Sequence, residues 1–327
     1  MKAILYEEFG GPEKMFIGEC PDPVPKSNEL LVSVKATALN RADLLQMQGL
    51  YPPPPGTTEI LGLEMSGVIE ELGSEVTDWK VGDRIFALLP GGGYAEKVTI
   101  SADLAMPIPA GMSFEQAAAI AEVFLTAYLN LCKLGGLKKE QVVLIHAGAS
   151  GVGTAAIQLV KQAGAKSIIT VRSKEKVDFC MSLGADFVIQ GEGDFAPKIL
   201  EWTEQRGVDL ILDCIGAPYW RDNLASIALD GKIIVIGAMG GGEIDAVPLW
   251  ELIKRRISVI GSSLRSQTLE DKIQLSKGFA TEWLPKFETG ELKPVVDQVY
   301  DWGEVTQAHK YLAKNKNTGK VILKISR

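Results

Sequence analysis

The chain has 327 residues, a length that suggests two domains of ordinary size. Hydrophobic residues make up 46% and charged residues 23%, which is typical of a soluble globular protein with a substantial core. The formal net charge of −7 argues against nucleic acid as the main partner, because phosphate binding requires clustered Lys and Arg.

The N-terminal segment MKAILYEEFGG is charged and strand-like, so we expect no signal peptide. No uninterrupted apolar run reaches the length that a bilayer requires, so we expect no membrane contact. The cysteines are scattered without a C-x-x-C pair, which favours a reducing compartment and a cytoplasmic location over a disulfide framework. They are Cys20, Cys132, Cys180 and Cys214.

The first third of the chain is rich in β signals. Short apolar runs alternate with Gly and Pro turns up to about residue 120, which predicts a compact barrel-like β domain. The prolines of GLYPPPPG, residues 49–56, cannot lie inside a ladder and predict a stiff polyproline segment. The expected strands cover residues 30–39, 67–73, 81–89 and 94–100.

From about residue 120 strands alternate with helices. Ser113 is placed to cap the first helical stretch. Short buried strands follow in QVVLIHA, SIITV, DFVI, VDLILDCIG, KIIVIG and ISVIGSS, a pattern that predicts a parallel doubly wound sheet with right-handed crossovers. The tail returns to β character. We therefore expect an α/β protein in which a Rossmann domain, residues 122–290, interrupts a β domain of residues 1–121 and 291–327.

A glycine-rich turn follows the strand at residues 142–147 and leads into a helix. Gly148, Gly151 and Gly153 can supply a tight turn, a close approach to a pyrophosphate and close helix–strand packing. Ser150 replaces the glycine of the usual G-x-G-x-x-G spacing. Its hydroxyl could reach a cofactor or substrate, or could bond its own backbone as in an ordinary turn. The context favours a dinucleotide site over a turn without a ligand.

The end of the next strand, SIITV, indicates which dinucleotide binds. An NAD site normally places an acidic residue there for the ribose 2′-hydroxyl. This chain has Arg172, Ser173, Lys174 and Lys176, which would attract a 2′-phosphate that a carboxylate would repel. A solvated basic helix start is the alternative, but helix dipoles favour acids at that end. We therefore expect NADPH, although Glu175 lies nearby.

The sequence predicts no metal site. Catalytic zinc needs about three Cys, His or acidic ligands, and the chain has only two histidines. His146 lies in the apolar strand before the glycine turn, and we interpret it as a buried strand residue. His309 lies in the expected C-terminal helix.

Several motifs together resemble a known family. They are ALNRADLLQMQGLYPPPPG, LGLEMSG, LLPGGGYAEKV, HAGASGVGTAAIQLVK, LILDCIG, ALDGKIIVIGAMGGG and AHKYLAKNKNTGKVIL. The chain resembles the quinone oxidoreductases (ζ-crystallin-like) of the zinc-free medium-chain dehydrogenase/reductase superfamily, especially the tumour-suppressor-inducible, PIG-type members. The likeness implies a GroES-like first domain, a Rossmann second domain, NADPH and a quinone substrate. It also implies a homodimer or homotetramer joined through the strand ISVIGSSL, residues 257–264.

The resemblance also assigns roles to residues. Asn40, Asp43 and Tyr51 would line the substrate pocket. Together with the glycine turn and the basic strand end, the resemblance gives as coenzyme-binding residues Thr126, Gly148, Ser150, Gly151, Val152, Gly153, Arg172, Ser173, Lys176, Cys214, Gly216, Met239, Gly240, Ser262, Ser263, Leu264 and Asn317.

One position departs from the family pattern, and another distinguishes the chain from zinc-dependent members of the superfamily. Gly191 stands where many relatives have a tyrosine beside the 2′-phosphate, and Arg172 could compensate. Leu63 occupies the place of a histidine that precedes the counterpart of Glu64 in zinc-dependent members.

Without a metal or an obvious acid, the chemistry must need little help from the protein. Hydride transfer to a quinone or an activated enone qualifies, because the coenzyme performs the difficult step. Tyr51 is the candidate donor to the developing oxyanion, assisted by Ser150 or Asn40, although it could simply pack on the prolines. Two alternatives stay open: an enoyl-thioester or enone reductase on the same fold, and an NADPH-binding regulatory or structural protein with little turnover.

Overall fold

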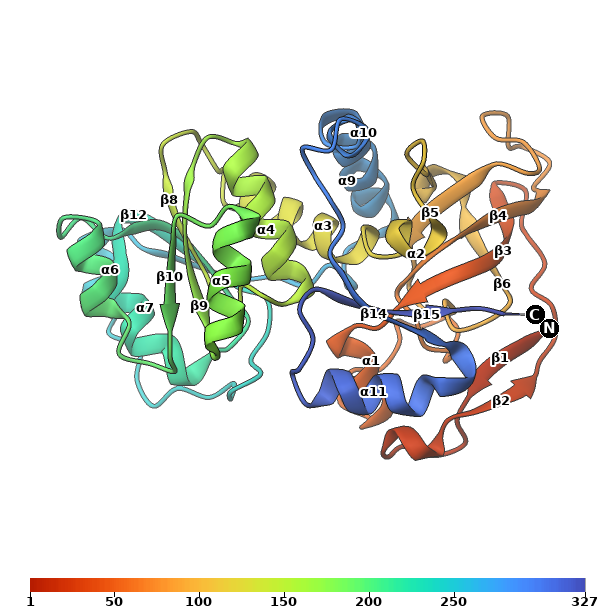
Figure 1. Cartoon of the computed structure of the whole chain (residues 1–327), viewed down its shortest axis with the longest axis horizontal. Coiled ribbons are helices and arrows are strands. Elements are labelled where there is room, and N and C mark those ends of the chain that lie inside the picture. Colours follow the sequence, from red (N-terminus) through yellow and green to blue (C-terminus); the bar gives the residue numbers. More distant parts are fainter. Residues whose placement is uncertain (327) are drawn as a thin grey trace. The chain divides into compact units, whose positions relative to one another are not determined.

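The computed structural model describes residues 1–326 and divides into two compact units. The first contains Met1–Leu125 and Arg265–Arg327, and the second contains Thr126–Leu264 (Figure 1). Residues 265–290, which we assigned to the Rossmann domain, group with the first unit. The helices α9 (Leu269–Glu282) and α10 (Pro285–Glu288) explain this, because Phe279 and Phe287 pack against Phe124 of the first unit.

The second unit is built on six parallel strands in the order β10-β9-β8-β11-β12-β13. Renumbered from the first strand of this unit, the order is 3-2-1-4-5-6, that of the doubly wound dinucleotide-binding fold. The predicted fold class is thus confirmed. The strands are β8 (Val142–Ile145), β9 (Lys166–Val171), β10 (Phe187–Gln190), β11 (Val208–Asp213), β12 (Ile227–Val235) and β13 (Ser258–Gly261).

Helices cover this sheet on both sides. The helices α4 (Gly151–Gln162) and α5 (Lys174–Leu183) lie on one side, and α6 (Ala196–Trp202) and α7 (Trp220–Ser226) lie on the other (Figure 1). Strands covered on both faces are continuous apolar runs, and Leu144, Ile168 and Ile211 are accordingly buried in the core. The unit also contains η4 (Ala217–Tyr219) and α8 (Leu249–Arg255).

One apolar stretch, Phe114–Leu134, is long enough and apolar enough to cross a membrane by length and composition alone. It is mostly buried inside the protein, which is usual for a core helix of a soluble protein. It consists of α2 (Phe114–Ala117), α3 (Ala121–Ala127) and the π-helix η3 (Tyr128–Leu134). Ser113 caps α2 as predicted, since its hydroxyl accepts a hydrogen bond from the backbone N–H of Gln116 at 3.2 Å.

The first unit contains a seven-stranded sheet in the order β14-β15-β3-β4-β5-β7, with β6 paired to β3. The central strand β3 pairs with β4 along one edge, and with β6 and β15 along the other. The tail therefore rejoins the β domain, as its composition predicted. The strands are β3 (Glu29–Ala38), β4 (Glu64–Leu72), β5 (Arg84–Leu88), β6 (Lys97–Ser101), β7 (Met106–Pro107), β14 (Val296–Asp301) and β15 (Lys320–Lys324).

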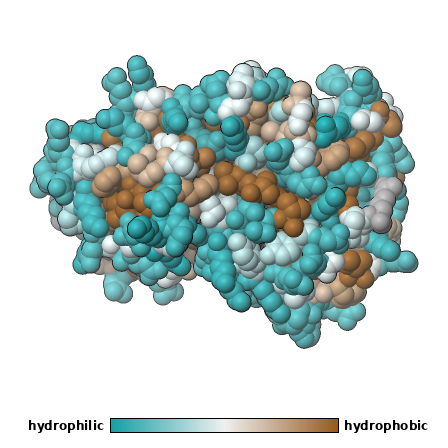
Figure 2. Space-filling view, viewed as in Figure 1, coloured by the Kyte–Doolittle hydropathy of each residue, from teal (hydrophilic) through white to brown (hydrophobic). Residues whose placement is uncertain are grey.

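Short elements complete the first unit. Residues 51–56 form no helix or strand, as predicted for the proline segment. A hairpin of β1 and β2 forms a separate two-stranded sheet, and Phe16 and Ile17 of β2 are exposed. Figure 2 shows an apolar patch in the region of the view where this sheet lies in Figure 1. These elements are β1 (Lys2–Leu5), β2 (Phe16–Glu19), η1 (Pro12–Lys14), α1 (Arg41–Met47), η2 (Ala102–Leu104), η5 (Trp302–Glu304) and α11 (Val305–Ala313).

Candidate active site

The glycine-rich turn lies where the strand order of the second unit reverses, between β8 and β11. Open α/β sheets bind ligands at such a switch point. Ser150 is the N-cap of α4, and its Oγ accepts a hydrogen bond from the backbone N–H of Gly153 at 3.1 Å. The hydroxyl therefore bonds its own backbone, the ordinary-turn alternative, and it retains one proton to donate. Gly151 and Val152 form the first turn of the helix.

Two glycines of this turn are required by packing. A Cβ at position 148 would lie 1.9 Å from Cγ2 of Ile169 on the neighbouring strand β9. A Cβ at position 153 would lie 2.5 Å from the carbonyl oxygen of Gly148. Gly148 and Gly153 therefore allow the helix to approach the sheet as closely as a dinucleotide-binding turn requires.

The loops after β11 and β12 bring together four of the residues that we predicted to bind the coenzyme. The backbone N–H of Met239 donates to the carbonyl of Cys214 at 3.1 Å, and that of Gly240 donates to the carbonyl of Ile215 at 2.9 Å. Gly216 has φ +84°, and a Cβ there would lie 2.5 Å from the carbonyl oxygen of Gly241. Only glycine fits this crossing of two backbones.

A buried polar network that the sequence analysis did not predict shapes these loops. Asp213 accepts hydrogen bonds from the backbone N–H groups of Ile215 at 2.7 Å and Gly216 at 3.1 Å. Asn223 donates to Asp213 at 2.9 Å, and its Oδ1 lies 2.7 Å from Nε2 of His146. Because burial lowers the pKa of His146, its imidazole is neutral and donates from Nε2. His146 is thus the buried strand histidine that we expected.

The basic end of β9 carries an ion pair. Nε of Arg172 lies 2.9 Å from Oε1 of Glu192, and the two side chains are 58% and 66% exposed. Ser173 is the N-cap of α5, and Lys176 lies in the first turn of that helix. Hydrogen bonds from the backbone N–H of Glu175 and from the Ser173 hydroxyl lower the pKa of the Glu175 carboxyl. Glu175 is therefore a carboxylate turned back on its own helix start.

The loop after β13 contains a buried hydroxyl group that a bound ligand would satisfy. The Oγ atom of Ser262 is buried and has no hydrogen-bond partner within residues 1–326. An unsatisfied buried hydroxyl is costly, and a ligand is one means of satisfying it. Ser262, Ser263 and Leu264 follow β13 at the carboxyl edge of the sheet. Thr126 lies where α3 meets the π-helix η3, an element frequent at functional sites.

In the first unit, Asp43, a predicted substrate-pocket residue, is hydrogen-bonded at the start of helix α1. Its carboxylate accepts hydrogen bonds from the backbone N–H groups of Asn40 at 2.7 Å and Gly62 at 3.1 Å. The first of these bonds caps helix α1. Burial raises the pKa of Asp43 to about 6, despite the opposing hydrogen bonds.

Asp43 also ends a buried chain of hydrogen bonds. The hydroxyl of Tyr94 donates to Asp43 at 3.3 Å and lies 3.1 Å from Nε2 of His309. Burial lowers the pKa of His309 to about 4, so the neutral ring donates its proton to the Tyr94 oxygen. These hydrogen bonds connect Asp43 of α1 through Tyr94 to His309 of α11 and so hold the two helices in place.

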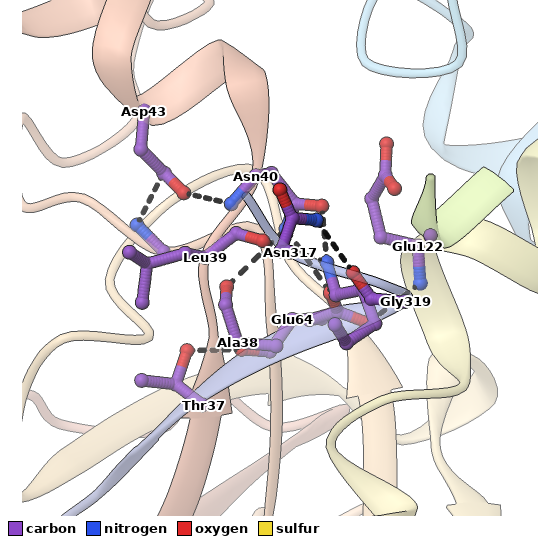
Figure 3. Close-up of polar contacts among 12 residues, drawn as sticks. Thr37, Ala38, Leu39, Asn40, Asp43, Glu64, Glu122, Asn317 and Gly319 are labelled. Carbon is purple, nitrogen blue, oxygen red and sulfur yellow. Dashed lines mark hydrogen bonds and ion pairs between the residues drawn. The ribbon is translucent and has the colours of Figure 1, made fainter. Parts of the chain in front are cut away.

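Asn40 belongs to a second buried cluster (Figure 3). Its Nδ2 donates to Oε1 of Glu64 at 3.0 Å, and its Oδ1 accepts a hydrogen bond from Nζ of Lys320. Lys320 pairs with Glu64 at 2.8 Å, and their side chains are only 4% and 0% exposed. The backbone N–H of Glu122 donates to the other carboxylate oxygen at 2.8 Å. Asn40, a predicted catalytic and substrate-pocket residue, is therefore fixed by side-chain hydrogen bonds to Glu64 and Lys320.

Asn317 lies beside this cluster in the first unit (Figure 3). Its Nδ2 donates to the carbonyl oxygen of Gly319 at 2.7 Å, and its side chain is buried. This contact shapes the turn that leads into β15 and so places Lys320 beside Glu64.

Tyr51, the candidate proton or hydrogen-bond donor, lies against an arginine that the sequence analysis missed. The guanidinium carbon of Arg265 is 5.2 Å from the centroid of the Tyr51 ring, and Nη1 donates to the Tyr51 carbonyl at 3.3 Å. Arg265 is buried and also donates to Gln46 at 2.9 Å and to the Pro90 carbonyl at 3.0 Å. Nothing local in the sequence marks Arg265, because its partners lie more than 170 residues away.

Two family models match the chain. The model described as "Alcohol dehydrogenase GroES-like domain" matches residues 26–110, and that described as "Zinc-binding dehydrogenase" matches residues 151–278. The residues present do not fit a catalytic zinc. Among residues 1–326, no group of three or more His, Cys, Asp or Glu side chains could hold a metal ion. Glu64 is already neutralised by Lys320.

Curated relatives and solved structures match over nearly the whole chain. The quinone oxidoreductase of Sus scrofa is 31% identical over 99% of this chain and 97% of its own length. The crystal structure of Escherichia coli quinone oxidoreductase complexed with NADPH has a TM-score of 0.88 at 31% identity, covering 99% of this chain and all of the other. The structure of the CurK enoyl reductase has a TM-score of 0.89 at 29% identity, covering 99% of each chain.

These similarities agree with the two folds described above. The first unit contains the GroES-like domain, and the second is the Rossmann domain with its dinucleotide-binding turn. The relatives support an oxidoreductase activity that depends on a nicotinamide coenzyme. The chain is therefore an enzyme of the quinone oxidoreductase family, within the medium-chain dehydrogenase/reductase superfamily.

Proposed function

We propose that this enzyme reduces quinones, or activated enones, with NADPH and without a metal. The observation that carries the proposal is the glycine-rich turn at the switch point of a 3-2-1-4-5-6 sheet, followed by a cationic strand end. Arg172 and Lys176 follow β9, where an NAD-specific site would have a carboxylate. The E. coli relative complexed with NADPH supports this choice of coenzyme.

All but one of the residues proposed to hold the coenzyme belong to the second unit, and Asn317 belongs to the first. The N-terminus of α4 would face the pyrophosphate, and Arg172, Ser173 and Lys176 would bind the 2′-phosphate. The loops of Cys214, Gly216, Met239 and Gly240, with Ser262 to Leu264, Thr126 and Asn317, complete the proposed set. The reduced coenzyme supplies a hydride to the electrophilic acceptor.

The protein's own part in the reaction is positioning and stabilisation of the oxyanion. We propose Tyr51 as the donor, because its ring and backbone are held by Arg265 and its hydroxyl is the one side-chain hydrogen-bond donor of residues 49–56. Ser150 is the proposed assisting hydroxyl. We also propose Asn40 as an assisting group, and Asn40 and Asp43 as residues of the substrate pocket, both held by hydrogen bonds at the start of α1.

The similarity to the CurK enoyl reductase favours a second candidate, reduction of an enoyl thioester on the same fold. Both reactions deliver a hydride to a carbon conjugated with a carbonyl, so both need the same coenzyme site and one hydrogen-bond donor. They differ in the size and charge of the acceptor.

We also propose a cytoplasmic homodimer or homotetramer joined through β13, which is an edge strand of its sheet. Val259 on this strand is exposed, as are Trp250 and Ile253 on α8. An exposed apolar edge strand can pair with a strand of another molecule, and a second copy of this chain would cover it. Sedimentation velocity should therefore show a dimer or tetramer, and Val259→Lys should shift it toward the monomer.

The test of the reaction is steady-state oxidation of NADPH against a panel of acceptors, with and without a metal chelator. We expect the highest kcat/KM with a naphthoquinone and no effect of the chelator. Preference for crotonyl thioester would favour the enoyl reductase. Absence of turnover with every acceptor, despite coenzyme binding, would indicate a regulatory or structural protein. Loss of activity in the chelator would contradict the metal-free reaction.

A further inference from the structure

The ion pair between Arg172 and Glu192 joins the carboxyl ends of two neighbouring strands. Arg172 directly follows β9, and Glu192 lies two residues after β10. Val171 and Gln190 are partners in the parallel ladder, and the backbone N–H of Gly191 donates to the carbonyl of Val171 at 2.9 Å. The carboxylate is therefore brought to the arginine by the sheet itself.

The loop that carries Glu192 is open to solvent around its two glycines, and the Glu192 side chain is 66% exposed. Gly191 and Gly193 have φ of +134° and +76°, and a Cβ at either position would meet nothing within 4 Å. Asp194 has φ +48° and pairs with Arg221 at 3.1 Å, where both side chains are exposed. Burial, followed by the charge of Glu192, raises the pKa of the Tyr219 phenol, and Arg172 opposes this effect. Both charges thus lie over the same part of the unit.

We propose that Glu192 is a specificity residue of the coenzyme site, which occupies Arg172 in the free protein and lowers the preference for NADPH over NADH. The inference rests on the proposed binding of the 2′-phosphate by Arg172. A 2′-phosphate would compete with the carboxylate for the Arg172 guanidinium and would lie near its negative charge. A ribose 2′-hydroxyl requires no displacement, and it can donate to a carboxylate as in NAD-specific sites.

The expected size of the effect follows from the exposure of the pair. Both side chains are more than half exposed, so the pair changes a binding constant by a factor of about 1.4 to 5. Repulsion between Glu192 and the phosphate acts in the same direction. The effect should shrink as salt is raised, since the Debye length falls from about 10 Å at 0.1 M to about 3 Å at 1 M.

Calorimetric titration with adenosine 2′,5′-bisphosphate and with 5′-AMP tests the proposal without turnover. Glu192→Gln should tighten the bisphosphate about two- to fivefold and leave 5′-AMP unchanged or slightly weaker. Asp194→Asn is the matched control, because it removes the same charge from the same loop but from a different arginine. It should change the ratio of the two affinities much less. In an Arg172→Ala background, Glu192→Gln should no longer raise the ratio.

The outcomes separate this inference from the proposed function. An unchanged ratio in Glu192→Gln, with the wild type still preferring the bisphosphate, would overturn the role of Glu192 alone. An equal shift in Asp194→Asn would do the same, because it would show a general effect of charge. Failure of the wild type to bind either nucleotide or NADPH would overturn both proposals.

Discussion

Removal of Lys320 should strongly destabilise the protein, because it leaves one partner of a buried ion pair without its counter-charge. Its ammonium group has three protons and three acceptors: Glu64 at 2.8 Å, the Leu39 carbonyl at 2.8 Å and the Asn40 side-chain oxygen. Lys320→Met would leave the Glu64 carboxylate, which is 0% exposed, without a counter-charge. The Leu39 and Asn40 oxygens would each lose a donor as well.

Breaking a buried ion pair in this way costs about 3–5 kcal/mol. That is a large part of the total stability of a domain, which is about 5–15 kcal/mol. Denaturant unfolding followed by circular dichroism measures the loss. Lys324→Met is the matched control, because it removes a lysine from the exposed end of the same strand and should cost no more than about 0.5 kcal/mol.

The double variant Lys320→Met with Glu64→Gln tests the ion pair itself. It removes both charges, so it should recover part of the stability lost in the single variant. A loss below about 1 kcal/mol for Lys320→Met, or a double variant less stable than the single one, would refute this account of the cluster.

Three further predictions concern the site and its support. Burial raises the pKa of Asp43 from 3.8 to about 6, so its stabilising contribution, up to about 3 kcal/mol, is lost as the pH rises through this interval. Burial lowers the pKa of His309 from 6.5 to about 4, so its contribution is lost as the pH falls. Between pH 4 and 6, Asp43→Asn should gain stability relative to the wild type with rising pH, and His309→Gln with falling pH; parallel unfolding curves would contradict both signs. Tyr51→Phe should lower kcat for quinones, by less than the roughly 10²–10³-fold loss typical of an optimally placed donor, with unchanged Kd for NADPH; equal kcat values would remove Tyr51 from the mechanism. Changing Arg172 and Lys176 to Ala together should raise KM for NADPH far more than for NADH, and an unchanged ratio of the two KM values would place the 2′-phosphate elsewhere.

The periodicity of the chain predicted most of the fold, because its elements depend on local patterns. Alternating strands and helices gave the doubly wound sheet, and the cap at Ser113 formed as expected. The domain boundary near residue 265 carries no such signal. The connection from β13 to α9, residues 262–268, is not low-complexity, and the place of α9 and α10 depends on packing of Phe279 and Phe287 against Phe124.

The polar residues of the site show the same limit. The glycine-rich turn could be interpreted from its spacing, since backbone geometry at Gly148 and Gly153 is a local requirement. The hydrogen-bond partners of Asn40 and Asp43 could not be predicted from spacing, because Lys320 lies 280 residues from Asn40 and Tyr94 lies 51 residues from Asp43. Arg172 was visible as a cation, but its pairing with Glu192 depends on the register of two strands.

A fluorescence titration of the purified protein with NADPH and, separately, with NADH tests directly whether the protein binds a phosphorylated coenzyme. Binding of a phosphorylated coenzyme at the cationic end of β9 predicts saturable binding of one NADPH per chain, with a lower Kd than that for NADH. A lower Kd for NADH, or no saturable binding of either coenzyme, would contradict it.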